Sequence, residues 1–160
     1  MYKAVSVLFV LSILMGGINT CRKVEDKTGS QCQAGKNFCV KIGDELFNMD
    51  ATLQALDTTN PGYRVTFTDG SGSNQRVLKL DIYGSNVTAG TYQFTAADTP
   101  IAGSAQLRFV TQAKEYVSNS GSVTVTDVAP HSISGSFSGT VERDGESLPV
   151  ANGNFSEVKN

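Results

Sequence analysis

The sequence is poor in the residue types that carry enzyme chemistry. Its 160 residues include one histidine, three cysteines and no tryptophan, and charged residues make up 18% of the chain. A Ser–His–Asp hydrolase would have to use His131, but no G-x-S-x-G elbow is present, and His131 follows Pro130 in an expected turn. One histidine without a Cys/His cluster is also too few ligands for a zinc site. We therefore expect no catalytic residue, no metal and no cofactor.

Basic charge is also lacking. The formal net charge is −2 at pH 7, so no positive field would recruit nucleic acid. The length suits one domain with a core of its own. We expect a globular, glycine-rich domain that does not bind nucleic acid.

The N-terminus has the pattern of a secretory signal peptide. Lys3 supplies a positive charge, residues 4–15 are almost continuously apolar, and small or turn-forming residues follow up to Thr20. The apolar run is shorter than the roughly 20 residues that a transmembrane helix needs. We predict that residues 1–20 are a signal peptide.

Cys21 stands where such a peptide would be cleaved, and charged residues begin directly after it. The segment resembles a bacterial lipobox, in which the cysteine thiol takes a diacylglycerol and the freed amine a further acyl chain, such as palmitate. Asn19 and Thr20 depart from the tightest form, as is common in Bacteroidetes lipoproteins. Two or more acyl chains anchor a protein stably. We predict that acylated Cys21 ties the protein to a membrane.

Residues 21–35 are polar and read as a tether between lipid and domain. Glu25 and Asp26 are similar to the short acidic signal that sends some Bacteroidetes lipoproteins to the cell surface, or they are simply part of a solvated tether. We expect a lipid-anchored protein of the outer membrane. Its orientation, to the surface or to the periplasm, stays open, and retention in the inner membrane is a third option.

Two further cysteines, Cys32 and Cys39, are separated by six residues. The spacing is too wide for a CxxC redox motif, and an exported protein can form disulfides. We predict a structural disulfide, worth no more than roughly 2–3 kcal/mol for so short a loop. The alternative is two unpaired thiols, with Cys39 buried in a strand.

From residue 36 to residue 160 the sequence predicts a single all-β domain. Apolar and polar residues alternate with the period of two that half-buried strands show. Asp69-Gly70 and Asp144-Gly145 supply tight-turn chemistry, and residues 49–56 are the one stretch that also fits a helix. We expect nine or ten mainly antiparallel strands in a β-sandwich or partly closed barrel. The predicted inward residues are Tyr63, Val65, Phe67, Leu78, Leu80, Ile82, Leu107, Phe109, Val123, Val125, Ile133, Gly135, Phe137, Gly139, Val141, Phe155 and Val158.

Four weaker patterns each have an ordinary explanation. Residues 69–74 faintly resemble a calcium loop but contain a single carboxylate, so a hairpin loop explains them better. Asp81 and Glu142 could pair as glycosidase acids only if they faced one another, and solvated surface is the default. Asp57-Thr58-Thr59 is similar to a short O-glycosylation motif of exported Bacteroides proteins. A sugar platform would need aromatic rings, but core packing explains the tyrosines better: Tyr83, Tyr92 and Tyr116.

Four short motifs occur in order in the C-terminal half: "GTYQF" at Gly90–Phe94, "GSVTVTDV" at 121–128, "HSISGSFSGTV" at 131–141 and "NGNFSEV" at 152–158. This succession resembles the DUF6252-like group of small Bacteroidetes lipoproteins, over roughly residues 37–158. The resemblance implies a β fold and a lipoprotein location. It implies no activity, because the group has none assigned.

The sequence therefore predicts a non-catalytic cell-envelope protein that binds an unknown protein or glycan partner or has a structural role. One alternative is a carrier of lipid or another small molecule, which would need an apolar cavity in the barrel. The other is an envelope hydrolase, which would need acidic or Ser/His groups that converge in a cleft.

Overall fold

The computed structural model describes residues 32–96 and 100–160. The predicted signal peptide, Cys21 and residues 21–31 of the predicted tether lie outside the described residues. In the described part of the chain, no helix is long and apolar enough to cross a membrane.

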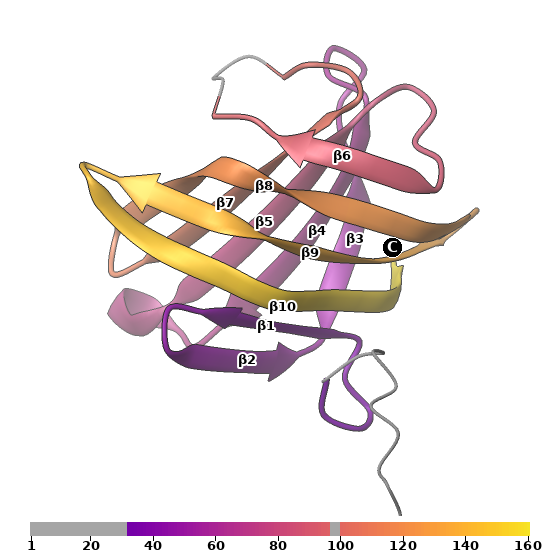
Figure 1. Cartoon of the computed structure of the whole chain (residues 1–160). Coiled ribbons are helices and arrows are strands. Elements are labelled where there is room, and N and C mark those ends of the chain that lie inside the picture. Colours follow the sequence, from indigo (N-terminus) through magenta and orange to yellow (C-terminus); the bar gives the residue numbers. More distant parts are fainter. Residues whose placement is uncertain (1–31, 97–99) are drawn as a thin grey trace, which may run out of the picture.

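The described chain is built from ten strands and one short 3₁₀ turn, and residues 49–56 contain the end of β2 and all of β3 instead of a helix (Figure 1). This confirms the predicted all-β fold. The elements are β1 (Phe38–Ile42), β2 (Glu45–Met49), β3 (Ala51–Ala55), β4 (Gly62–Asp69), η1 (Gly72–Asn74), β5 (Arg76–Tyr83), β6 (Gly90–Phe94), β7 (Ser104–Thr111), β8 (Lys114–Ala129), β9 (Ser132–Arg143) and β10 (Glu146–Lys159).

All ten strands belong to one sheet, in the order β2-β1-β10-β9-β8-β6-β7-β5-β4-β3. Every pairing is antiparallel except that of β6 with β7. The long strand β8 pairs first with β7 and then with β6, and a register shift between Ser118 and Ser120 marks the change. Strands β10, β9 and β8 therefore cross in front of β3, β4, β5 and β7 (Figure 1). The sheet curls into a nearly closed barrel with one open seam.

The interior holds most of the predicted inward residues together with others that were not predicted, among them Phe38 and Phe47, and a chain of aromatic rings runs through it. Phe38 stacks on Phe67 with ring centroids 5.5 Å apart, and Phe47 meets the edge of Phe67 at 5.6 Å. The chain continues through Phe109 on one side and Phe137 on the other. Rings at these separations add stabilisation beyond the apolar area that they bury. Tyr63 is the one predicted inward aromatic residue that stays only partly buried.

Two glycines have a steric purpose: Gly135, which was predicted to face inward, and Gly153, which was not. Phe155 lies directly across from Gly135, and Phe137 across from Gly153. A Cβ atom at either glycine would come within 2.6 Å of the opposing ring. The alternation of glycine and phenylalanine in β9 and β10 thus lets each ring lie flat on the neighbouring strand.

Candidate functional site: the open seam of the barrel

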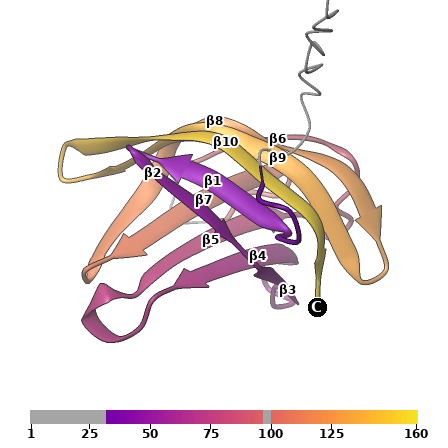
Figure 2. The same ribbon diagram turned by 90° about the horizontal axis from the view of Figure 1, so that it is seen from below.

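The seam lies between β2 and β3, which are the two ends of the sheet order. They are consecutive strands with only Asp50 between them, so the chain turns a corner there and passes from one wall to the other. In the view from below, β2 runs across β5 and β4 and leads into β3 (Figure 2). Backbone pairing does not close the barrel at this corner, and side chains bridge it instead.

Arg76 bridges the seam on the β2 side. Its guanidinium forms ion pairs with Glu45 of β2 and Asp69 of β4, and its Cζ lies 4.7 Å from the centroid of the Phe47 ring. A cation over an aromatic face adds to the ion pairs. These contacts line a hollow of about 530 Å³ that is also bordered by Gln112 and other residues of the neighbouring turns. Arg76 therefore links β2 to β4 and β5 through side chains.

Asn37 bridges the seam on the β3 side. Its Oδ1 accepts a hydrogen bond from the Ala51 N–H at 2.8 Å, and its Nδ2 donates to the Ala51 carbonyl at 3.3 Å. Beside it, Lys36 Nζ donates to Asp50 Oδ2 at 2.9 Å. This hydrogen bond holds the pKa of the Asp50 carboxyl below its usual value. A side-chain amide thus takes the place that a neighbouring strand would occupy.

A disulfide holds Asn37 at this position. Cys32 and Cys39 are bonded, with their Cα atoms 5.0 Å apart, which fits the predicted pairing. The closed loop contains both Lys36 and Asn37. Residues 32–35, which the sequence prediction assigned to the tether, are attached to the domain by this bond and by the Gln33 N–H, which donates to Asn48 Oδ1 at 3.0 Å.

The register of β3 shows which of its backbone groups face the seam. The Leu56 N–H donates to the Gly62 carbonyl, and the antiparallel register continues this ladder through Gln54 and Thr52. Because alternate residues point their N–H and C=O groups to opposite edges, those of Ala51, Leu53 and Ala55 face away from β4. Within the described chain, the backbone groups of Leu53 and Ala55 have no partner.

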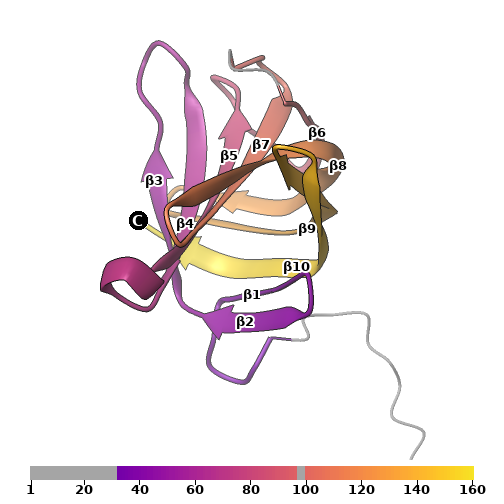
Figure 3. The same ribbon diagram turned by 90° about the vertical axis from the view of Figure 1, so that its left-hand side faces the viewer.

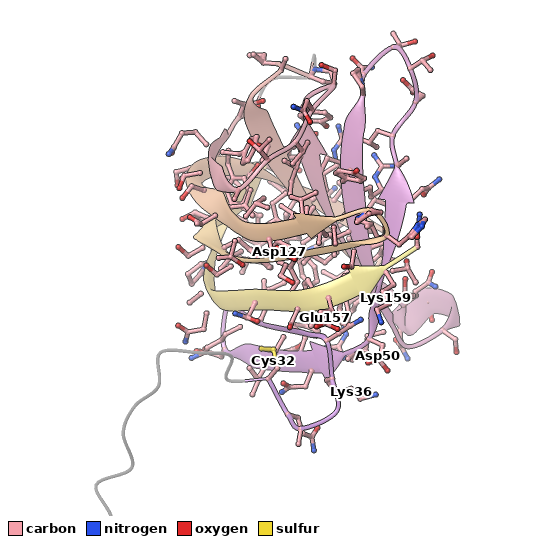
Figure 4. All side chains as sticks on the ribbon, turned by 90° about the vertical axis from the view of Figure 1, so that its right-hand side faces the viewer. Cys32, Lys36, Asp50, Asp127, Glu157 and Lys159 are labelled. Atoms are coloured by element: carbon pink, nitrogen blue, oxygen red, sulfur yellow. A yellow bond between two sulfur atoms is a disulfide. The ribbon has the colours of Figure 1, made fainter. Side chains whose placement is uncertain are left out.

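A hollow lies at each end of β3. One, of about 440 Å³, is lined by Lys36, Asn37, Asp50, Glu157 and Lys159, among others. Figure 4 shows Lys36 and Asp50 on one side of it and Glu157 and Lys159 on the other. The second hollow, of about 530 Å³, is lined by residues that include Ala55, Leu56, Tyr63, Val128 and Pro130. Between them, β3 forms the outer edge of its wall (Figure 3).

A second polar cluster lies outside the barrel, on the wall of β4, β5 and β7. Arg64 donates to both carboxylate oxygens of Asp81 at 2.6 and 2.7 Å, and the Asp81 side chain is only 2% exposed. The Tyr83 hydroxyl lies 3.3 Å from Asp81 and 3.5 Å from Gln106, which also accepts from Arg108 at 2.7 Å. Burial, and then the Asp81 charge, raises the pKa of Tyr83 to about 12. Arg108 also pairs with Glu115 at 3.6 Å, so each arginine has a carboxylate partner and the cluster is suited to holding three strands together.

The structure does not assemble the candidate acids of a glycosidase. Asp81 was expected on solvated surface, but it is buried against Arg64, so that expectation was wrong. Glu142 faces the same outer surface from β9, and β7 and β8 lie between the two strands. At about 4.8 Å per strand the separation is about 14 Å. The two acids of a glycosidase lie closer than about 9.5 Å.

The remaining candidates are ordinary structural residues. His131 is exposed in the turn after β8, and Asp69 of the supposed calcium loop is paired with Arg76. Tyr83 and Tyr116 are buried, and Tyr92 bonds Thr88, so they do not form an exposed platform. Asp57, Thr58 and Thr59 are exposed in the turn after β3, where Asp57 accepts from the Thr59 N–H. Within the described residues there is no group of three or more metal-binding side chains.

Sequence reasoning did not find Asn37 or Arg76. Nothing in their sequence surroundings marks them, because each acts on a segment that only the corner at Asp50 brings near. No family model, no curated protein and no solved structure matches the chain.

Proposed function

We propose that this protein is a lipid-anchored protein of the cell envelope with a binding or structural role and no catalytic activity. The observation that carries the proposal is the succession of Lys3, an apolar run and Cys21 followed at once by charges. The Cys32–Cys39 disulfide supports it, because such bonds persist in exported proteins. The sequence motifs support membership in the DUF6252-like group of Bacteroidetes lipoproteins.

The geometry of the described domain favours binding over the two alternatives. The barrel interior is occupied by Phe38, Phe67 and the rings around them, which leaves no reason to assign a carrier role. The candidate acids do not converge, and His131 lies alone in a turn. The open seam is the feature that a partner protein could use.

The anchor is tested by a Cys21→Ala variant of the full-length protein. We expect the natural protein to fractionate with membranes and to incorporate radiolabelled palmitate, and the variant to do neither. A Cys32→Ala variant is the matched control, since it also removes a cysteine but leaves the proposed lipidation residue intact. A Cys21→Ala protein that still carries label and remains with membranes would contradict the proposal.

Orientation is tested by protease treatment of intact cells. Loss of the domain from unlysed cells would indicate the surface, where an adhesion or glycan-capture partner fits. Protection until lysis would indicate the periplasmic face.

A further inference from the structure

We propose that the open edge of β3 is a docking site for an extended peptide segment of a partner protein, which pairs with β3 as an additional strand. This deepens the proposed binding role, but it does not require the membrane anchor. If the anchor test fails, the docking proposal is unaffected. If the docking test fails, the proposed membrane anchor is unaffected.

The first argument is that the structure already places an amide on this edge. The Asn37 carboxamide both donates to and accepts from Ala51, which is the pair of hydrogen bonds that one residue of an adjacent antiparallel strand would make. The backbone of this edge therefore has the geometry to bind an amide. Beyond Asn37, Leu53 and Ala55 offer two more such pairs of groups, with no partner in the described chain.

The second argument is that the sequence and the pairing of β3 lack the lysine, proline and bulge features that often protect an edge. Natural edge strands carry lysine, proline or bulges that prevent pairing with another chain. The β3 sequence, ATLQA, contains none of these, and its pairing with β4 is regular. On the other side of the seam, Glu45 of β2 is instead engaged in an ion pair with Arg76.

The chemistry of the occupant follows from the surroundings. No charged side chain lies on β3, and the hollow beyond Ala55 is lined by uncharged residues, among them Leu56, Tyr63 and Val128. A charged residue there would lose water without gaining a partner. The docked segment is thus uncharged at the residues that pair with β3. It also carries an apolar side chain that enters the hollow beyond Ala55. Pairing through the backbone provides affinity, and the hollow provides selectivity.

The test uses Ala55, whose side chain is exposed and whose N–H points into the seam. Ala55→Pro removes this donor and leaves the β4 ladder intact, because that ladder uses Gln54 and Thr52. Ala55→Val is the matched control, since it keeps the N–H and suits a strand. Both variants are compared with the natural protein by thermal unfolding, so that a folding defect is recognised.

The probe is a displayed library of random seven-residue peptides selected on the full-length protein. The enriched peptides are then synthesised in natural form and with N-methylated central residues. We expect uncharged, β-branched sequences that slow amide hydrogen exchange at Leu53 and Ala55. Ala55→Pro should weaken their binding at least about fivefold, the value of one net hydrogen bond, and Ala55→Val should not. N-methylation of the peptide should abolish binding even to the natural protein, so the test does not depend on the folding of a variant.

Three results would overturn the proposal. They are a selection that enriches no peptide, enriched peptides that bind Ala55→Pro and the natural protein equally, and exchange protection that appears elsewhere than on β3. A dimer in sedimentation that Ala55→Pro abolishes would show that a second copy of the chain occupies the edge instead of a partner.

Discussion

The wall of β4, β5 and β7 and the seam between β2 and β3 join strands in different ways. In the wall, neighbouring strands pair over seven or eight consecutive positions, and the ion pair between half-buried Arg64 and buried Asp81 ties two of them together. In the seam, a carboxamide, a lysine and an arginine replace the backbone ladder. The wall gains stability from complete pairing, whereas in the seam the backbone groups of Leu53 and Ala55 have no partner within the described residues.

The largest expected effect is in the wall. Arg64→Ala leaves the Asp81 carboxylate buried without its ion-pair partner, and we expect a loss of about 3 kcal/mol of unfolding free energy. Arg64→Lys should recover only part of this, because lysine cannot donate to both oxygens at once. Urea unfolding of both variants measures the difference. A loss below about 0.5 kcal/mol, as for an exposed pair, would remove the distinction between wall and seam.

The disulfide should contribute less to the free energy of unfolding than the Arg64–Asp81 ion pair. Replacing both Cys32 and Cys39 with serine frees the loop that holds Asn37, and we expect a loss of about 2 kcal/mol. The natural protein unfolded in the presence of a reductant should show a similar loss, which serves as a control without substitutions. Faster amide exchange at Ala51 in the double variant would link the bond to the seam. If amide exchange at Ala51 is unchanged in the double variant, the disulfide does not affect the seam.

The side-chain closure of the seam should contribute least to stability. Asn37→Ala removes two hydrogen bonds to Ala51, and we expect a loss of about 1 kcal/mol together with faster exchange of the Ala51 amide. Arg76→Ala, on the other side of the seam, is the matched control. It should cost a similar amount but leave Ala51 exchange unchanged. If Asn37→Ala and Arg76→Ala accelerate exchange of the Ala51 amide equally, the two sides of the seam open together, contrary to this expectation.

The pH dependence of the wall gives a finer test. The pKa of Tyr83 is raised to about 12 from its usual value near 10, first by burial and then by the Asp81 charge. The neutral phenol is therefore favoured in the folded state. Its contribution is complete below pH 10 and is lost as the pH rises from 10 to 12. Tyr83→Phe should show a shallower loss of unfolding free energy over this range than the natural protein. Identical slopes would show that other groups account for the loss.

Most of the strand pattern could be predicted from the sequence, because each inward face is set by local alternation. Leu78, Leu80 and Ile82 are fully buried as expected, and Asp144 and Gly145 both have positive φ in a tight turn. The parallel pairing of β6 with β7 was not specifically predicted, since it depends on how β8 bends between two partners. The burial of Asp81 was missed because alternation shows only that it faces outward.

The sequence by itself therefore determined the all-β class, many of the residues that face the core and the N-terminal pattern on which the proposed lipid anchor rests. These depend on neighbours within a few positions along the chain. Only the tertiary structure decided that the sheet curls into a barrel, that the corner at Asp50 leaves a seam, and that Asn37 lies on the edge of β3. Such features depend on contacts between distant segments, and the free energy of those contacts has no signature in any one stretch of sequence.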